Sequence, residues 1–179
     1  MVTGIDHFAA LGLERQLDLS HETLRAHYDG RCQESHPDVG GTAQGFDAVA
    51  EAYKTLSSPS RRLRHWLELS GNKVVEDGSL PPAVEERFGP VNALLHKASE
   101  IAERHRGARS TLVRSLAEAE GISLQGQIVE ARGELDNVIT EMVSTFRRFD
   151  ESDPHEVRAE AMELVRSLSF LERWETQLR

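Results

Sequence analysis

Residues 36–62 read HPDVGGTAQGFDAVAEAYKTLSSPSRR, and the middle of this stretch predicts an amphipathic helix. Side chains that are three, four or seven residues apart share one face of a helix. The apolar residues follow this spacing at Phe46, Val49, Ala50, Tyr53 and Leu56. A second helix is expected directly afterwards, because Ser58 suits an N-cap and Pro59 at the first helical position does not need the N–H that it lacks. That helix would bury Leu63, Trp66 and Leu67.

Two more helices are predicted on the amino-terminal side. A short one runs from Asp6 to Gly12, where the glycine suits a C-terminal cap. A longer one follows the N-cap Ser20 and ends near Ser35, because the residue before a proline is pushed out of the α conformation. Its apolar seam is Leu24, Tyr28 and Cys32. Residues 1–71 are therefore expected to form an antiparallel helical hairpin, whose loop holds His-Pro-Asp, with short helices beside it.

The remaining residues predict a bundle of helices after a polar linker at 72–80. Three seams of apolar residues repeat at steps of three and four between residues 84–102, 124–142 and 157–171, which is typical of an antiparallel three-helix bundle. Gly89-Pro90 is expected to kink or split the first of them. The pattern does not place residues 107–121. The expected fold class is thus all-α, with an N-terminal hairpin domain at 1–71 and a C-terminal bundle at 81–179.

Composition narrows the function classes. Acidic residues outnumber basic ones 30 to 21 among 179 residues, which argues against a nucleic-acid partner and favours protein partners. The single cysteine, Cys32, and the lack of a long apolar run predict a reduced, cytoplasmic protein with no membrane segment. The histidines are not spaced for a shared metal site, and no nucleophile motif is present. We therefore expect no metal, no cofactor and no enzymatic activity.

The sequence resembles a known family at several places. The stretch quoted above is similar to the His-Pro-Asp loop and third helix of the J domain, the module of the DnaJ class of co-chaperones. More narrowly, QLDL at 16–19, SPSRRLRHWLELSG at 58–71 and VRSLSFLERWETQLR at 165–179 resemble HscB, the J-domain co-chaperone of iron–sulfur cluster assembly. The resemblance covers residues 5–71 and, less closely, 124–179. It implies a J domain followed by a client-binding helical bundle.

This resemblance also implies functions for individual residues. His36, Pro37 and Asp38 would bind a DnaK-class chaperone and speed its ATP hydrolysis, with Asp38 pairing with an arginine of that partner. The helix before them offers Arg25 and Arg31 as chaperone-facing charges. On the bundle, Phe170 aligns with a family aromatic that contacts an iron–sulfur scaffold protein, and Leu94-Leu95 stands where the family has apolar contacts. The client-binding candidates implied by the resemblance are therefore Phe170, Leu94 and Leu95.

Physical chemistry supports a function for the tripeptide. Because Pro37 restricts its own φ and its neighbour, the loop loses less entropy when it holds Asp38 toward a partner. Loss of one member of a desolvated charge pair costs roughly 2 to 5 kcal/mol. Binding alone would not speed ATP hydrolysis, because a ligand shifts only an equilibrium between states for which its affinity differs.

Other interpretations stay open at this point. Arg25 and Arg31 are outnumbered on their helix by acids, so they also fit a solvated face. Phe170 fits a core position equally well. The chain would then be a J-like interaction module that does not stimulate a chaperone, or a general J protein whose client is unrelated to iron–sulfur assembly.

Overall fold

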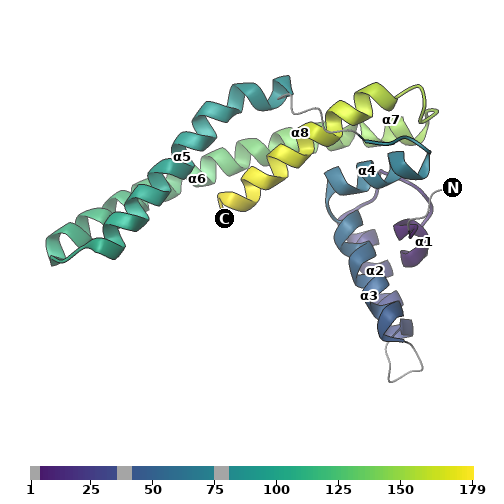
Figure 1. Ribbon diagram of the computed structural model, residues 1–179, viewed down its shortest axis with the longest axis horizontal. Coiled ribbons are helices and arrows are strands. Elements are labelled where there is room, and N and C mark those ends of the chain that lie inside the picture. Colours follow the sequence, from purple (N-terminus) through teal and green to yellow (C-terminus); the bar gives the residue numbers. More distant parts are fainter. Residues whose placement is uncertain (1–4, 36–41, 75–80) are drawn as a thin grey trace. The chain divides into compact units, whose positions relative to one another are not determined.

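The computed structural model describes residues 5–35, 42–74 and 81–179, and helices are the only regular secondary structure among them (Figure 1). The all-α class predicted from the sequence is thereby confirmed. The helices are α1 (His7–Leu11), α2 (His21–Ser35), α3 (Ala43–Leu56), α4 (Pro59–Leu69), α5 (Pro82–Gly107), α6 (Thr111–Ser144), α7 (Phe146–Asp150) and α8 (Arg158–Gln177).

Local capping explains where the first helices begin and end. The Asp6 carboxylate accepts hydrogen bonds from the backbone N–H groups of Phe8 and Ala9, so it satisfies donors that the first turn of α1 leaves free. Gly12 closes α1 at a φ of 68°, a left-handed conformation that suits glycine. Ser58 accepts from the N–H of Arg61 at 3.3 Å and caps α4. These three caps confirm the predicted starts and ends.

The chain forms two compact units by its internal contacts, and each is described separately. The first unit consists of Met1–Gly78 and Glu141–Ser169, and the second of Ser79–Thr140 and Phe170–Arg179. This grouping differs from the division expected from the sequence, in which residues 81–179 form one bundle. The reason lies in side chains that join α7 to the amino-terminal helices.

Asp150, the last residue of α7, makes one of these connections. Its two carboxylate oxygens accept hydrogen bonds from the N–H groups of Leu17 and Asp18, at 2.7 and 2.8 Å. Burial raises the pKa of Asp150, although both hydrogen bonds act in the opposite direction. The second connection is the buried Arg62, whose guanidinium lies 5.4 Å from the centre of the Phe146 ring. Residues far apart in the sequence thus share one core.

In the first unit, α2 and α3 lie side by side as the predicted hairpin, and α1 packs against α3 (Figure 1). The rings of Tyr28 and Tyr53 stack with their centres 4.3 Å apart between the two long helices. The fully buried apolar residues of α1 to α4 and the loop after α1 are Phe8, Leu11, Leu17, Ala52, Leu56, Leu63 and Leu67.

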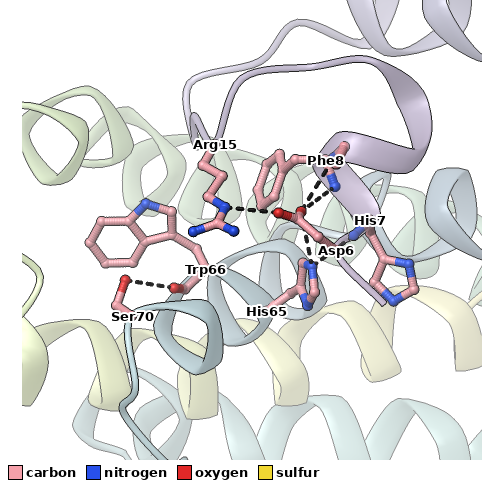
Figure 2. Close-up of polar contacts among 8 residues, drawn as sticks. Asp6, His7, Phe8, Arg15, His65, Trp66 and Ser70 are labelled. Carbon is pink, nitrogen blue, oxygen red and sulfur yellow. Dashed lines mark hydrogen bonds and ion pairs between the residues drawn. The ribbon is translucent and has the colours of Figure 1, made fainter. Parts of the chain in front are cut away.

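A polar cluster joins α1 to α4 (Figure 2). The N–H of His7 donates to Nε2 of His65 at 3.0 Å, so this nitrogen must be unprotonated. Burial, and then the neighbouring His7, lowers the pKa of His65 to about 4. Burial alone would raise the pKa of Asp6, but the Arg15 hydrogen bond at 2.8 Å and the α1 N–H groups outweigh it and lower this pKa.

The structure decides two points about the second unit that the sequence left open. Of the kink or split expected at Gly89-Pro90, the split does not occur, because the helix α5 continues through Pro90. Proline removes only one backbone hydrogen bond, and the neighbouring turns with the buried Val84 and Val91 keep the helix in place. Residues 111–120, which the sequence did not place, form the first turns of α6, and this helix runs on through Gly121.

The end of the α5–α6 hairpin is held by side-chain pairs. Arg104 on α5 makes two hydrogen bonds to the carboxylate of Glu120 on α6, and His105 lies 3.2 Å from Glu118. Between the helices the core is formed by small and medium-sized residues. The buried apolar residues of the second unit include Val84, Val91, Ile101, Ala117, Leu124, Leu135, Ile139, Leu171, Trp174 and Leu178.

Candidate chaperone-binding and client-binding surfaces

The His-Pro-Asp tripeptide falls in the connection between α2 and α3. His36, Pro37 and Asp38 lie outside the described residues. The flanks of the connection are described: α2 ends at Ser35, and Thr42 caps α3 by accepting from the N–H of Gly45 at 3.1 Å. The helix α2 is described as far as Ser35, where the sequence predicted its last turn, while the functions of the tripeptide stay predictions.

Arg25 lies on the solvent side of α2. Its Nε donates to the Asp29 carboxylate at 3.0 Å, and 57% of its side chain is exposed. This hydrogen bond raises the pKa of Arg25, and the guanidinium also lies 5.9 Å from the centre of the Tyr28 ring. An exposed pair of this kind is weak and exchanges readily, so Arg25 can reach a partner.

Arg31 lies on a different side of α2 and contacts α1. Its Nε donates to the carbonyl oxygen of Ala10 at 3.1 Å, and one Nη donates to Glu34 at 2.9 Å. One helical turn earlier, Nδ1 of His27 lies 3.1 Å from the carbonyl oxygen of Leu11. The last carbonyl groups of α1 thus obtain partners from α2. Arg31 has a structural contact that the sequence did not reveal, because its acceptor is a backbone oxygen 21 residues earlier.

The aromatic residue proposed for client binding, Phe170, is half-buried on α8. Its ring centre is 6.3 Å from that of Trp174, and the guanidinium of Arg173 lies 5.5 Å from the Phe170 ring centre. The ring centre of Trp174 also lies 6.1 Å from that of Phe88 on α5, and Phe88 is 45% exposed. Phe170 therefore belongs to an aromatic cluster that remains partly open to solvent.

The two leucines proposed beside it lie on α5 and are also half-buried. Leu94 lines a small concavity of about 260 Å³ together with Val91 and with Leu135 of α6. Its neighbours are thus apolar residues of the α5–α6 pair, whereas those of Phe170 are Trp174 and Arg173. Partial exposure leaves both groups able to contact a partner.

The described fold is a helical hairpin, whose connecting segment holds His-Pro-Asp in the sequence, followed by long helices. Solved structures agree with this fold. The chaperone HscB from Vibrio cholerae aligns with a TM-score of 0.63 over 97% of this chain and 95% of its own, at 17% identity. Human co-chaperone protein HscB aligns with a TM-score of 0.50 over 98% and 81%, at 19% identity.

These similarities establish that the chain has the HscB fold. No protein-family model and no curated protein matches the sequence. Within the described residues, no helix combines the length and the apolar character that a membrane span requires. The same residues contain no group of three or more metal-ligating side chains arranged to hold an ion.

Proposed function

We propose that this chain is a J-domain co-chaperone that stimulates ATP hydrolysis by a DnaK-class chaperone and presents a client to it. The observation that carries the proposal is the HscB fold over almost the whole chain, with His-Pro-Asp between its two hairpin helices. The proposed client is an iron–sulfur cluster scaffold protein, and the proposed location is the cytoplasm. Hydrolysis takes place in the partner, so the chain regulates a reaction and is not itself an enzyme.

The proposed mechanism assigns orientation to His36 and Pro37 and charge to Asp38. A carboxylate and an arginine form a directional pair, so Asp38 selects one arrangement of its partner. To speed hydrolysis, the J domain must bind the hydrolysis-competent state of the chaperone more tightly than the other state. Arg25 adds an exposed positive charge on the preceding helix. Arg31 contributes less to chaperone binding, because its side chain donates a hydrogen bond to the carbonyl oxygen of Ala10 in α1.

The first test is single-turnover ATP hydrolysis by the DnaK-class chaperone of the same organism. We expect the wild type to accelerate hydrolysis and His36→Gln and Asp38→Asn to lose most of this effect. Asp47→Asn is the matched control, because Asp47 is an exposed acid on α3. A wild type that gives no acceleration would refute the co-chaperone function.

The client is tested by binding to a purified iron–sulfur scaffold protein. In the proposed function, the partly exposed Phe170 and the leucines Leu94 and Leu95 contact the scaffold. Phe170→Ala is then expected to weaken binding at least about tenfold, a loss comparable with a central interface aromatic. The control is Leu112→Ala, which changes an exposed leucine on α6. Equal binding by both variants would exclude this client surface.

A second candidate is an interaction module that does not stimulate a chaperone. The pairing of both α2 arginines within the chain favours it, because Arg25 bonds to Asp29 and Arg31 to Glu34 and Ala10. This candidate predicts a partner that binds the bundle and is indifferent to Asp38→Asn. Loss of that partner on the same substitution would exclude it.

A further inference from the structure

The helix α6 has two apolar faces, and only one of them is buried. The buried apolar residues of α6 are Ala117, Leu124, Leu135 and Ile139. About half a turn away around the helix, Leu116, Ile122 and Val129 are 55%, 72% and 64% exposed. Together with the small residues between them they form a line with steps of three and four, which we call the outer seam. Its members are Leu116, Ala119, Ile122, Gly126, Val129 and Gly133.

Large and small residues alternate along the outer seam. A second α6 helix can pack against it in the antiparallel direction, with the midpoint at residues 124–125. Ile122 of each copy then lies opposite Gly126 of the other, and Val129 and Ala119 form the next pair. A Cβ atom at Gly126 would meet no neighbouring atom within 4 Å, so space for a side chain of another helix is open there. A parallel pair would instead set each glycine against its own copy and leave gaps.

The charged residues beside the outer seam have an order that is complementary to itself. On one flank, at steps of four and seven, the side chains are Arg114, Glu118, Gln125, Arg132 and Asp136. Read in the opposite direction, each positive position becomes negative, and Gln125 stays at the centre. The same antiparallel pairing therefore places Glu118 opposite Arg132 of the other copy, and Arg114 opposite Asp136. Each pair occurs twice, because the arrangement has two-fold symmetry.

The acidic residues of the opposite flank do not meet each other in this pairing. Glu130 of one copy falls between Leu116 and Ser123 of the other. Glu120 has nearly the same height as Glu130 of the other copy, but it is directed toward α5, where Arg104 donates two hydrogen bonds to its carboxylate. Like charges in direct opposition, which would disfavour association, are thus absent from this flank.

In the described part of a single copy, Arg132 has an unused hydrogen-bond donor. Its Nε is shielded from solvent and has no partner. The side chain lines a hollow of about 370 Å³ between α6 and the end of α8, whose acidic members are Asp136 and Glu175. In the antiparallel arrangement, the carboxylate of Glu118 from the other copy reaches this hollow. Within its own copy Glu118 lies 3.2 Å from His105 in an exposed pair, and such pairs exchange readily.

We propose that the outer seam joins two copies of this chain in an antiparallel dimer, with the two-fold axis beside Gln125. The order of sizes and the order of charges both match when α6 is paired with itself, which neither a different protein nor a membrane surface would require. The contact extends over about five turns of one helix, so we expect a dissociation constant on the order of 10 μM. Unfolding measured well below that concentration reports the monomer. The inference goes beyond the proposed function and does not depend on chaperone stimulation.

The first test measures the dimer by sedimentation equilibrium of the full chain, from about 1 to 300 μM, on both sides of the expected dissociation constant. Ile122→Ala should raise the dissociation constant at least about tenfold, because a symmetric dimer loses this side chain twice. Val113→Ala is the matched control and should leave the constant unchanged. Val113 is also an exposed apolar residue of α6, at 40%, but it lies outside the outer seam. Circular dichroism checks that the variants keep their helices.

The second test exchanges the charges of one pair. Glu118→Arg sets two arginines against each other at both ends of the interface, so it should raise the dissociation constant at least about tenfold at low salt and less at high salt. Adding Arg132→Glu restores opposite charges with reversed signs, and the double variant should return to within about threefold of the wild type. Glu103→Arg makes the same change of net charge at an exposed position of α5 and should have little effect.

The third test determines the direction of the pairing by cross-linking with a short bismaleimide. Cys32 is first replaced by serine, so that only an introduced thiol reacts. Gln125→Cys, beside the proposed axis, should cross-link to its own copy. Glu118→Cys alone should not, because the two introduced thiols would be separated by 14 residues, or about 21 Å of helix. A mixture of Glu118→Cys and Arg132→Cys should cross-link efficiently.

Four results would overturn the proposal. The first is a chain that remains monomeric over the whole concentration range. The second is a dimer that Ile122→Ala and Val113→Ala affect equally, which would place the interface elsewhere. The third is efficient cross-linking of Glu118→Cys to itself, or a charge exchange that does not restore the dimer, because either would exclude the antiparallel pairing. The fourth is binding of a monomer to phosphatidylserine vesicles that depends on Ile122, which would assign the outer seam to a membrane.

Discussion

The two hairpins of this chain, α2–α3 and α5–α6, differ in what packs against them. In the first, α1 lies against the pair, with Phe8 and Leu11 fully buried and Arg31 bonded to a carbonyl of α1. In the second, the far end has no third helix in the part of its unit that the structure describes, and Ile122 remains 72% exposed.

The difference shows that an amphipathic helix can use its apolar face either for folding or for binding. Both hairpins consist of amphipathic helices, and burial of apolar surface stabilises each by roughly 25 cal/mol per Å². Where a third element covers the apolar face, that energy stabilises the fold. Where the face is left open, the energy is available for binding a partner. The predictions below test this contrast in order of decreasing effect.

The largest effect is expected from Phe8→Ala. The substitution removes a fully buried ring from α1 and leaves a cavity beside α4, where the Phe8 ring stacks on His65. We expect the free energy of unfolding to fall by about 3 to 5 kcal/mol, measured by urea denaturation. Leu112→Ala, at the open hairpin, should change it by less than about 0.5 kcal/mol. Similar losses of unfolding free energy in Phe8→Ala and Leu112→Ala would contradict the difference between the covered and the open hairpin.

The second effect is a pH dependence that arises from His65. Its pKa in the folded chain is about 4, below the ordinary value of 6.5, so the unfolded chain binds more protons between these values. Stability should therefore be complete above about pH 6.5 and fall as the pH decreases toward 4, by at most about 3 kcal/mol. Denaturation curves across this range provide the measurement.

The variant His65→Gln serves as the control for that pH dependence. Glutamine can accept the N–H of His7 but does not titrate, so most of the slope between pH 4 and 6.5 should disappear. Burial also lowers the pKa of His7, so a smaller slope of the same sign should remain in the variant. If the variant and the wild type lose stability in parallel, another group is responsible.

A smaller effect is expected where α7 joins the first unit. Asp150→Ala leaves the N–H groups of Leu17 and Asp18 without their acceptors and should lower the free energy of unfolding by about 1 to 3 kcal/mol. Asp150→Asn keeps one acceptor oxygen, so its free energy of unfolding should lie between those of the wild type and Asp150→Ala. The exposed neighbour Glu151 provides the control, since Glu151→Ala should have almost no effect. Equal free energies of unfolding for Asp150→Ala and Glu151→Ala would argue against a stabilising contact between Asp150 and the loop after α1.

The smallest effect is a stabilisation by Gly121→Ala in α6. A Cβ atom at this position would lie 3.8 Å from Cγ2 of Ile101, an ordinary contact distance, and the helical backbone there suits alanine. We expect a gain of about 0.5 to 1 kcal/mol in thermal or urea denaturation. Gly126→Ala, with nothing within 4 Å, isolates the contribution of helix propensity alone. Destabilisation by Gly121→Ala would mean that the two helices approach more closely there.

Local sequence patterns predicted most helix boundaries because capping acts within one turn. Gly12, Ser20 and Ser58 all cap the helices for which they were chosen. The continuity of α5 through Pro90 and the extent of α6 were not predicted. Their stability depends on contacts across the hairpin, such as Arg104 with Glu120, and no sequence period reports these contacts.

The candidate site was predictable to a different degree. Arg25 and Phe170 keep partly exposed side chains, as a binding function requires. The contact of Arg31 with α1 could not be predicted, because its acceptor is a backbone carbonyl, which every residue carries. The functions of His36, Pro37 and Asp38 rest on the sequence resemblance and stay predictions.

The sequence by itself determined which segments are helical, where most of them are capped and which of their faces are apolar. These properties depend on residues within about four positions of one another. Only the tertiary structure decided which apolar faces are covered. Leu63 is fully buried and Ile122 is 72% exposed, although both lie on helices of the same chain. Burial depends on whether a third element from a distant part of the sequence packs against the apolar face, and the local pattern contains no information about that packing.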